Sequence, residues 1–464
     1  MHRTLPLAAV LLLACKASPD PTADPTDGPT DVPVEPQDLD GDGFTDADDC
    51  DDDDPAVFPG APERCDGQRN DCGGSWTSDA GVVDFEPVGG PVESWSSTFA
   101  AGGTVSIDRA GTLRICPGTY DVALSYGANA VPAVVIGTGA TLTGDPDGPG
   151  GLGIVDYAVE GDLTVEGLTL QGGSADYGGA LFAGGTVVLR DVVLTGNEAP
   201  GADDTGWGGA VYVAGDLTLE GVSFTDNTAG SNGGGLVVEA GSVTGDAHFE
   251  GNHATRGGAL LLLDTTGGLD GASFLGNGAA NGGHVYLSAS TVTFTDTTIE
   301  DTAGDSDNGG GILMFGGSLT LVGSTVSDNT ATAHGGGIYA DGATLTLQDS
   351  AVVDNLSVRF IGLQPSGLHG YGGGVYLNDA SLVCVDSDLG QNQSRWGAAT
   401  YADFSSTGGA TITSTSCDWN STPILGSSTA SQVDIVIDGF VGSIDYDPGT
   451  NATFTCDVTG CVTP

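Results

Sequence analysis

Basic side chains are scarce in this sequence. Ten of its 464 residues are lysine or arginine, against 62 aspartates and glutamates, and the formal net charge at pH 7 is −52. Nucleic acids and anionic membrane patches are bound through clustered lysine and arginine, so the composition argues against both classes of partner. Calcium is the natural counter-charge for so many carboxylates.

Catalytic signatures are missing as well. The sequence has no Gly-x-Ser-x-Gly, no His-Glu-x-x-His and no phosphate-binding loop, and its six histidines are scattered. A glycosidase needs two facing carboxylates, and the sequence does not show which of its many acids would face one another. We therefore expect a protein that is not an enzyme, with a polysaccharide-active enzyme as the alternative.

Helix formers and aromatic residues are few, whereas glycine, with 79 residues, is abundant. Between Gly178 and Ala399 one phrase recurs: two glycines, a small residue and then an aliphatic residue in most copies. The third positions, 24 to 37 residues apart, are Ala180, Ala210, Gly235, Ala259, His284, Gly311, Gly337, Gly374 and Ala399. A period of about 25 residues is typical of a solenoid.

Strands are expected between these glycines, because runs such as 186–189, 216–219 and 343–347 are short, β-branched and alternating. In several repeats an asparagine follows an apolar residue by three places, and such asparagines can stack as an amide ladder. The pairs are Phe224 and Asn227, Phe249 and Asn252, Phe274 and Asn277, Val326 and Asn329, and Val352 and Asn355. The predicted fold class is all-β: a right-handed parallel β-helix over residues 103–432.

The glycine phrase followed by Phe-x-x-Asn resembles the repeats of polymorphic outer-membrane proteins and other pectate-lyase-like β-helix surface proteins. The resemblance implies a β-helix at the cell surface. Because that fold carries adhesins, enzymes and scaffolds alike, it implies architecture more than activity. A pectate-lyase-like enzyme would need an acidic calcium cluster and a basic catalyst on one face, and no such set is recognisable.

The first fifteen residues resemble a bacterial lipoprotein signal. After a basic start comes an apolar run too short to span a bilayer, and Leu12-Leu13-Ala14 leads directly to Cys15. Cleavage there would leave Cys15 as a lipid-modified anchor, and Lys16 after it implies the outer membrane. An ordinary signal peptide cut elsewhere is the alternative. Residues 16–37, rich in proline, aspartate and threonine, are expected to form a disordered tether.

The acidic stretch that follows fits the twelve-position calcium loop, with Gly43 at the sharp turn. Phe44 would offer its carbonyl oxygen. No helical pattern flanks the loop, so it resembles thrombospondin type 3 or dockerin loops rather than an EF-hand. A solvated acidic tether is the alternative. The candidate ligands at positions 1, 3, 5, 7, 9 and 12 are Asp38, Asp40, Asp42, Phe44, Asp46 and Asp49.

The residues from Asp49 to Cys72 resemble the metal-binding motif of MopE-like bacterial surface proteins. The resemblance implies that an acidic module, residues 38–74, binds metal. No histidine or methionine cluster supports a soft metal ion, so calcium is the expected cofactor. Candidate ligands for further sites are Asp51, Asp52, Asp53, Asp66 and Asp71.

Eight cysteines remain beside Cys15, and the sequence leaves most of their pairing open. Cys456 and Cys461 are close enough to form a disulfide that closes a C-terminal cap, residues 433–464. Cys384 and Cys417 fall in late coils and read as plain core. Residues 75–102 are expected to be a linker or an N-terminal cap.

Two columns of the predicted coils are candidates for ligand contact. One lies two places after the small corner residue, and the other lies just before the glycines. A longer connection between Asn355 and Gly372 contains Arg359, which is a further candidate for ligand contact. Aromatic rings mixed with amides suit a groove for sugars, whereas stacked tyrosines that only stabilise neighbouring strands are the favoured alternative. The candidates are Tyr177, Trp207, Tyr212, Tyr286, Tyr339, Arg359, Tyr371, Tyr376 and Trp396.

The sequence thus predicts an outer-membrane or cell-surface protein, anchored by lipid, with a calcium-binding module and a β-helix. The expected role is binding or structural, in adhesion or in envelope and glycan interaction. The expected partners are the membrane through the lipid, and glycans or surface proteins.

Overall fold

The computed structural model describes residues 36–463 except 74–77, 145–152, 202–204, 305, 359–369, 395, 405–409, 421–434, 440–441, 447 and 458. The chain divides into two compact units: Met1–Ala61 with Asn70–Gly74, and Pro62–Arg69 with Ser75–Pro464. Cys15, the predicted lipidation site, and Arg359 lie outside the described residues.

The first unit consists of turns in its described part, with an isolated bridge between Phe58 and Asp71. Its apolar centre is small: Val57 and Ala61 are buried, and the rings of Phe44 and Phe58 stack with centroids 5.3 Å apart. A disulfide between Cys50 and Cys72 closes the unit.

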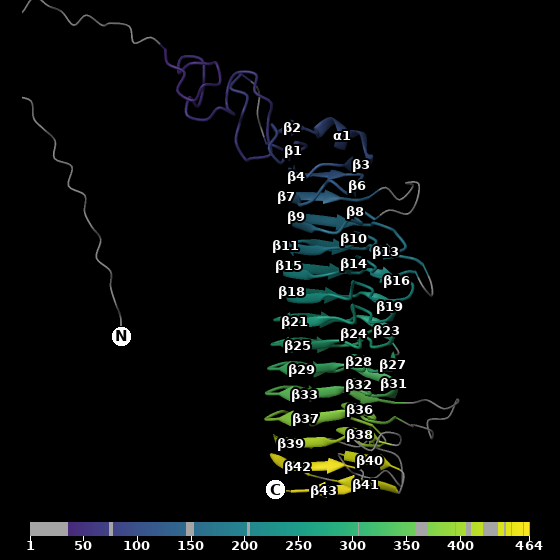
Figure 1. Cartoon of the computed structure of the whole chain (residues 1–464). Coiled ribbons are helices and arrows are strands. Elements are labelled where there is room, and N and C mark those ends of the chain that lie inside the picture. Colours follow the sequence, from purple (N-terminus) through teal and green to yellow (C-terminus); the bar gives the residue numbers. More distant parts are fainter. Residues whose placement is uncertain are drawn as a thin grey trace, which may run out of the picture. The chain divides into compact units, whose positions relative to one another are not determined.

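The second unit is a parallel β-solenoid, which confirms the predicted all-β class (Figure 1). Successive coils stack along one axis, and each coil contributes strands to two or three sheets. One six-residue helix, α1 (Ser96–Ala101), lies at the N-terminal end and buries Phe99.

The first sheet has 22 strands in the described part of the chain. Its terminal strands are β1 (Val83–Pro87), β2 (Glu93–Ser94), β42 (Ala452–Asp457) and β43 (Gly460–Val462). The strands between them are β4 (Gly111–Ile115), β5 (Gly118–Tyr120), β7 (Ala133–Leu142), β9 (Asp162–Gln171), β11 (Thr186–Arg190), β12 (Val193–Thr195), β15 (Leu217–Thr225), β18 (Ser242–Glu250), β21 (Thr266–Asp270), β22 (Ser273–Leu275), β25 (Thr291–Thr295), β26 (Thr298–Glu300), β29 (Ser318–Val322), β30 (Thr325–Ser327), β33 (Thr344–Gln348), β34 (Ala351–Val353), β37 (Ser381–Val385) and β39 (Ile412–Cys417).

Counted over the residues that the structure describes, the second sheet has 14 strands and the third has seven. The second is made of β3 (Gly103–Ile107), β6 (Val122–Tyr126), β8 (Val155–Tyr157), β10 (Leu181–Ala183), β14 (Val211–Ala214), β17 (Leu236–Glu239), β20 (Leu260–Leu263), β24 (Val285–Ser288), β28 (Ile312–Phe315), β32 (Ile338–Asp341), β36 (Val375–Asn378), β38 (Thr400–Asp403), β40 (Ile435–Gly439) and β41 (Gly442–Tyr446). The third is made of β13 (Glu198–Ala199), β16 (Thr228–Ala229), β19 (His253–Arg256), β23 (Gly278–Asn281), β27 (Ser306–Asn308), β31 (Thr330–His334) and β35 (Leu356–Ser357).

The glycine phrase sets the register of these coils. In β14 and β17, for example, Val211 pairs with Leu236 and Val213 with Val238, the same places of two successive repeats. Gly233 has a φ of +59°, which favours glycine, and a Cβ on Gly234 would lie 2.1 Å from the carbonyl oxygen of Gly258. The paired glycines are therefore required by a left-handed turn and by the close approach of the next coil.

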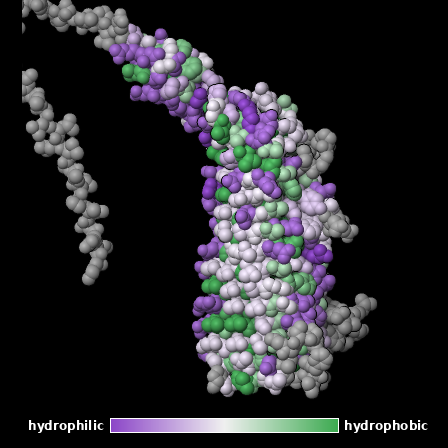
Figure 2. All heavy atoms as spheres, in the orientation of Figure 1, coloured by the Kyte–Doolittle hydropathy of each residue, from purple (hydrophilic) through white to green (hydrophobic). Residues whose placement is uncertain are grey.

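Aspartates share the corners with the glycines. Among the described residues, ten of the fifteen non-glycine residues with positive φ are aspartates, a residue type that tolerates the left-handed conformation. They include Asp226, Asp301 and Asp354, which occupy equivalent corners of different coils. These ten aspartates therefore have a structural role at the corners of the solenoid. In Figure 2 hydrophilic side chains gather along the edges of the coils.

One hydrophobic core runs through the solenoid from Val83 to Cys456. Phe224, Phe249 and Phe274 are fully buried and stack on one another with centroids 4.7 Å apart. Because a coil repeats its side chains in register, one buried position becomes a column of identical rings. Phenylalanine therefore recurs at the position where its ring can stack on the ring of the next coil.

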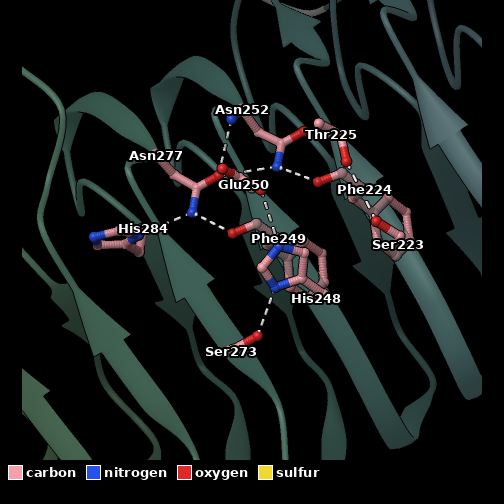
Figure 3. A network of polar contacts seen from close by, with 10 residues as sticks. All are labelled: Ser223, Phe224, Thr225, His248, Phe249, Glu250, Asn252, Ser273, Asn277 and His284. Atoms are coloured by element: carbon pink, nitrogen blue, oxygen red, sulfur yellow. Dashed lines mark hydrogen bonds and ion pairs between the residues drawn. The ribbon is translucent and has the colours of Figure 1, made fainter.

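The predicted asparagine ladder is present inside the same corner (Figure 3). In each step the side-chain nitrogen of one asparagine donates to the side-chain oxygen of the next, at 2.9 Å for Asn227 to Asn252 and for Asn252 to Asn277. These asparagines are buried, so each amide is satisfied without water. The complete runs are Asn197, Asn227, Asn252 and Asn277, and then Asn329, Asn355 and Asn392.

The ladder is interrupted at one coil. Thr302 stands in the asparagine position, and in the preceding coil His284 replaces the small residue after the glycines. The amide nitrogen of Asn277 lies 3.0 Å from Nδ1 of His284, and the hydroxyl of Thr302 lies 2.7 Å from the side-chain oxygen of Asn329. The large imidazole thus fills the space left by the shorter threonine, and both residues keep contact with the ladder.

Antiparallel strands close both ends of the solenoid. At the N-terminal end β1 pairs antiparallel with β4 and with β2. At the other end β39 pairs antiparallel with β42, β42 with β43, and β40 with β41. A parallel coil exposes a row of unpaired backbone groups, and these hairpins cover it.

The disulfides are more extensive than expected. The predicted bridge between Cys456 and Cys461 is present. Cys384 and Cys417, read as plain core, are bonded to each other and link two late coils. Cys65 is bonded to Cys116, which ties the segment 62–69 to the first coils of its own unit. Within the described part of the chain, no helix is long and apolar enough to cross a membrane.

Candidate functional site

The acidic loop of the first unit is built by carboxylates that accept hydrogen bonds from nearby backbone amides. The Oδ1 atom of Asp38 accepts from the amide of Gly41 at 2.7 Å, and that of Asp40 accepts from the amide of Asp42 at 3.1 Å. Gly41 and Gly43 have φ values of +84° and +105°, which favour glycine and allow the tight turn. The loop is therefore shaped by its own aspartates.

A second acidic segment faces this loop. The Oδ1 atom of Asp52 accepts from the amide of Leu39 at 3.2 Å, a bond across thirteen residues. The Oδ1 atom of Asp49 accepts from the amide of Asp51 at 3.0 Å. The disulfide of the neighbouring Cys50 holds this segment in the unit.

In four of these carboxylates, one oxygen accepts a hydrogen bond from a backbone amide and the other is shielded from solvent. The Oδ2 atoms of Asp40, Asp42, Asp49 and Asp52 are buried and have no hydrogen-bond partner within the described residues. Burying an unpaired carboxylate oxygen is costly unless a counter-ion satisfies it. The arrangement is what a cation site made of hard oxygen ligands requires.

Two groups of three carboxylates can be distinguished. Ligand atoms of Asp40, Asp42 and Asp49 lie within 4.8 Å of one another, and so do those of Asp38, Asp40 and Asp52. Asp40 belongs to both groups. Burial raises the pKa of its carboxyl, the amide of Asp42 lowers it, and the negative charges of Asp42, Asp49 and Asp38 raise it again. A bound cation would relieve this repulsion.

The other aspartates predicted as ligands lie outside both groups. Oδ1 of Asp46 accepts from the amide of Gln37 at 3.3 Å, and Phe44 contributes its ring to the stack on Phe58. Asp51 and Asp53 are exposed. Asp71 accepts hydrogen bonds from Gly60 and Gly73, and Asp66 accepts one from the amide of Gln68.

A third group combines Asp49 with the sulfur atoms of Cys50 and Cys72. These two sulfurs are bonded to each other, so neither is a thiolate donor. Within the described residues, all three groups that could hold a metal ion lie in the first unit. Its segments 36–61 and 70–73 contain no histidine and no methionine. The available donors are therefore oxygens.

The aromatic column of the solenoid lies on the second sheet, outside the main core. Tyr212 with Val237 and Leu261 forms one small cluster, and Tyr376 with Tyr401 forms part of another. Ligand contact would need exposed rings, yet Tyr212, Tyr376 and Tyr401 are each only 8 % exposed. Neighbouring side chains of the column before the glycines cover them, among them the predicted candidates Tyr177, Trp207, Tyr371 and Trp396.

These rings stack on one another, and their hydroxyl groups form hydrogen bonds with acidic side chains. Tyr339 stacks on Tyr376 with centroids 5.1 Å apart, and Tyr376 stacks on Tyr401 at 5.5 Å. The hydroxyl of Tyr401 donates to Asp438 at 3.0 Å, and that of Tyr212 donates to Glu239. Burial raises the pKa of Tyr339 to about 12, and Tyr286 is shifted upward by burial too. The geometry supports the alternative in which the rings stabilise neighbouring strands.

The comparisons with known proteins bear first on the acidic unit. Residues 49–76 match the family model Cu-binding MopE, described as a metal-binding motif. The chain carries a MopE-like metal-binding motif. Residues 221–239 and 323–341 match the Chlamydia polymorphic membrane protein repeat, so the solenoid carries that repeat twice. No curated protein matches the sequence.

One solved structure with a weak likeness is the A-module of mannuronan C-5 epimerase AlgE6 from Azotobacter vinelandii. It is 13 % identical, and the match covers 70 % of this chain and 90 % of that module, with a TM-score of 0.23. A TM-score of this size supports no inference about activity.

Proposed function

We propose that this chain is a cell-surface β-helix protein whose N-terminal module binds calcium and whose solenoid is a binding and structural scaffold. The observation that carries the calcium proposal is the set of four shielded carboxylate oxygens without a hydrogen-bond partner in the described chain. Each of these oxygens is held in place because the other oxygen of the same carboxylate accepts a hydrogen bond from a backbone amide.

The donor chemistry favours calcium over a softer metal ion. Copper and zinc prefer imidazole and thiolate ligands, whereas calcium takes six to eight oxygens. The two sulfurs near Asp49 are bonded to each other, and the groups contain aspartates alone otherwise. The name of the matching family refers to copper, so copper is the metal ion against which calcium must be compared.

Calorimetry of the full chain with its disulfides intact tests the metal. After treatment with EDTA, we expect titration with calcium to release or absorb heat that Asp42→Asn reduces. Asp53→Asn is the matched control, because Asp53 is exposed and lies outside both carboxylate groups. Tighter binding of Cu²⁺ than of Ca²⁺, or equal effects of the two variants, would reject the proposal.

The surface location rests on the polymorphic membrane protein repeats. Anchoring through a lipid on Cys15 remains part of the proposal, and mass spectrometry of the mature N-terminus in a bacterial host tests it. An acylated Cys15 is expected; a free N-terminus after cleavage at another bond would contradict it.

For the solenoid we propose a role in adhesion or in contact with envelope glycans. The polymorphic membrane protein repeats support this, together with the coils that stack along one axis and repeat the same strand positions on the outside of the solenoid. A glycan array combined with analysis of the products is the test. Bound and unchanged glycans are expected, whereas shortened or unsaturated oligosaccharides would show an enzyme instead.

A further inference from the structure

The second sheet carries an exposed aromatic ring midway along the solenoid. Phe315, the last residue of β28, is 39 % exposed and is the sole aromatic residue among the large exposed apolar side chains of the described chain. Its ring contacts Tyr286 of the preceding coil and Tyr339 of the following coil, with centroids 5.8 and 6.3 Å away. These two tyrosines are half-buried, whereas the tyrosines nearer the ends of the column are buried. Three successive coils therefore present rings with accessible surface.

A column of polar side chains runs beside these rings. Arg256, Asn281 and Asn308 occupy equivalent positions of three successive coils, just before the paired glycines. Only a glycine separates the two columns, because a Cβ on Gly257 would lie 3.1 Å from the Cβ of Tyr286. Burial raises the pKa of Tyr286, and the positive charge of the nearby Arg256 lowers it. The rings and the polar side chains thus belong to one continuous surface.

Arg256 lies in a chain with a formal net charge of −52, yet it has no carboxylate partner within the described residues. By contrast, Arg109, Arg114 and Arg190 each form an ion pair with a glutamate. Arg256 is exposed, and its contact from Nη1 to Oδ1 of Asn232 is long, at 3.4 Å. Most of its five guanidinium N–H groups are therefore available to a ligand.

These groups suit a ligand that has an apolar face and hydroxyl groups along its edge, as a sugar ring has. The ring of Phe315 can stack on the apolar face, while Arg256 and the two amides bond to the hydroxyls. The amides are weakly engaged with each other, since Nδ2 of Asn308 lies 3.4 Å from Oδ1 of Asn281. A polyanionic glycan would be repelled by the charge of the whole chain. With about 4.8 Å between coils, the three rings span about 10 Å of the axis, which suits a short oligosaccharide.

We infer that this surface, formed by Arg256, Asn281, Asn308, Phe315 and the two neighbouring tyrosines, binds a neutral, hydroxyl-rich glycan along the axis of the solenoid. The inference rests on the proposed glycan contact and adds the residues that make it and the chemical class of the ligand. The buried tyrosines further along the column keep their role in stabilising neighbouring strands.

A glycan array probed with the full, oxidised chain tests this surface. The array carries neutral oligosaccharides and uronate-containing oligosaccharides of matched length, and calorimetry with the strongest neutral binder gives the Kd of each variant. Phe315→Ala and Arg256→Gln should each raise this Kd about tenfold, through loss of the stacking ring and of the guanidinium donors. Both side chains are exposed, so the solenoid should stay folded, which circular dichroism checks.

Val193→Ala and Arg190→Gln are the matched controls, because they remove an exposed apolar side chain and a positive charge from the first sheet. Both should bind the glycan as the wild type does. Wild-type affinity in Phe315→Ala and Arg256→Gln would overturn this site, while the proposed glycan contact would stand. Binding confined to the uronate-containing members would overturn the neutral class of ligand. No binding to any glycan would overturn the proposed glycan contact as well.

Discussion

The two units of this chain are stabilised in different ways. In the solenoid one hydrophobic core continues from coil to coil, and fully buried phenylalanines stack on one another. In the acidic unit two buried apolar residues, Val57 and Ala61, and one stacked pair of rings make up the apolar interior of the described part. What the acidic unit has instead is a disulfide and converging carboxylates.

This difference has a simple physical basis. A small unit cannot bury enough apolar surface to offset its loss of conformational entropy, so it depends on cross-links or bound ions. A solenoid extends the same buried interface with each coil, and its stability grows with the number of coils. We therefore expect the acidic unit to lose its order without calcium or without its disulfide, whereas the solenoid stays folded, though less stable, when one of its disulfides is removed.

The largest effect is expected from a core substitution in the solenoid. Phe249 is fully buried and stacks on a ring on either side, so Phe249→Ala should lower the free energy of unfolding by about 3–5 kcal/mol. Urea unfolding followed by circular dichroism measures this. The calcium affinity of the chain is expected to stay unchanged; a weaker affinity would show that the two units are coupled and break the comparison.

Removing the disulfide of the acidic unit is expected to weaken calcium binding and to leave the stability of the solenoid unchanged. Cys50 and Cys72 are 22 residues apart, and a cross-link over such a loop contributes about 3 kcal/mol. If folding of the unit is linked to calcium, the Cys50→Ser/Cys72→Ser variant should raise the calcium Kd roughly a hundredfold. The unfolding transition of the solenoid should not move.

The matched control for this variant is Cys384→Ser/Cys417→Ser, which removes a disulfide between two late coils. It should lower the stability of the solenoid and leave the calcium Kd as it is. Equal calcium affinities in the two double variants would contradict a role of the Cys50–Cys72 bridge in ordering the site.

A smaller effect concerns pH and the interrupted ladder. Burial lowers the pKa of His284 from 6.5 to about 3, and its Nε2 has no hydrogen-bond partner in the described chain. The unfolded chain binds a proton below about pH 6.5 and the folded chain only below about pH 3. Protonation of His284 therefore favours the unfolded chain at low pH. The stability of the solenoid is unaffected by it above pH 6.5 and falls progressively as the pH is lowered toward 3.

Between pH 6.5 and pH 5 the loss should amount to about 2 kcal/mol in the free energy of unfolding of the solenoid. The His284→Gly/Thr302→Asn variant restores the repeat at both positions and removes the imidazole. Urea midpoints of the two proteins at several pH values are the measurement. Parallel pH profiles would mean that His284 does not contribute.

Much of the solenoid could be predicted from the sequence because its signal is repeated. The strands expected at 186–189, 216–219 and 343–347 correspond to β11, β15 and β33, and the asparagines expected to stack do so. The aspartates at left-handed corners were not recognised, because acidic residues were interpreted through their charge. Several of them occupy a repeat position at which other coils have a glycine, and this correspondence was the signal that could have identified them.

The candidate metal site was predictable only in part. The twelve-position pattern named Asp38, Asp40, Asp42 and Asp49, which the structure brings together, and it also named Asp46, which the structure places against Gln37. The partition into two groups depends on the contact of Asp52 with Leu39, thirteen residues away. An irregular loop has no period from which such a contact could be calculated.

The sequence by itself determined the coil, its period, its buried rings and its ladder, since each depends on local spacing that recurs along the chain. Tertiary structure alone decided the pairing of Cys65 with Cys116 and of Cys384 with Cys417, the compensation of Thr302 by His284, and the sharing of Asp40 by two carboxylate groups. These features join side chains that are distant in sequence and occur once. Their geometry follows from the folded chain and not from a pattern.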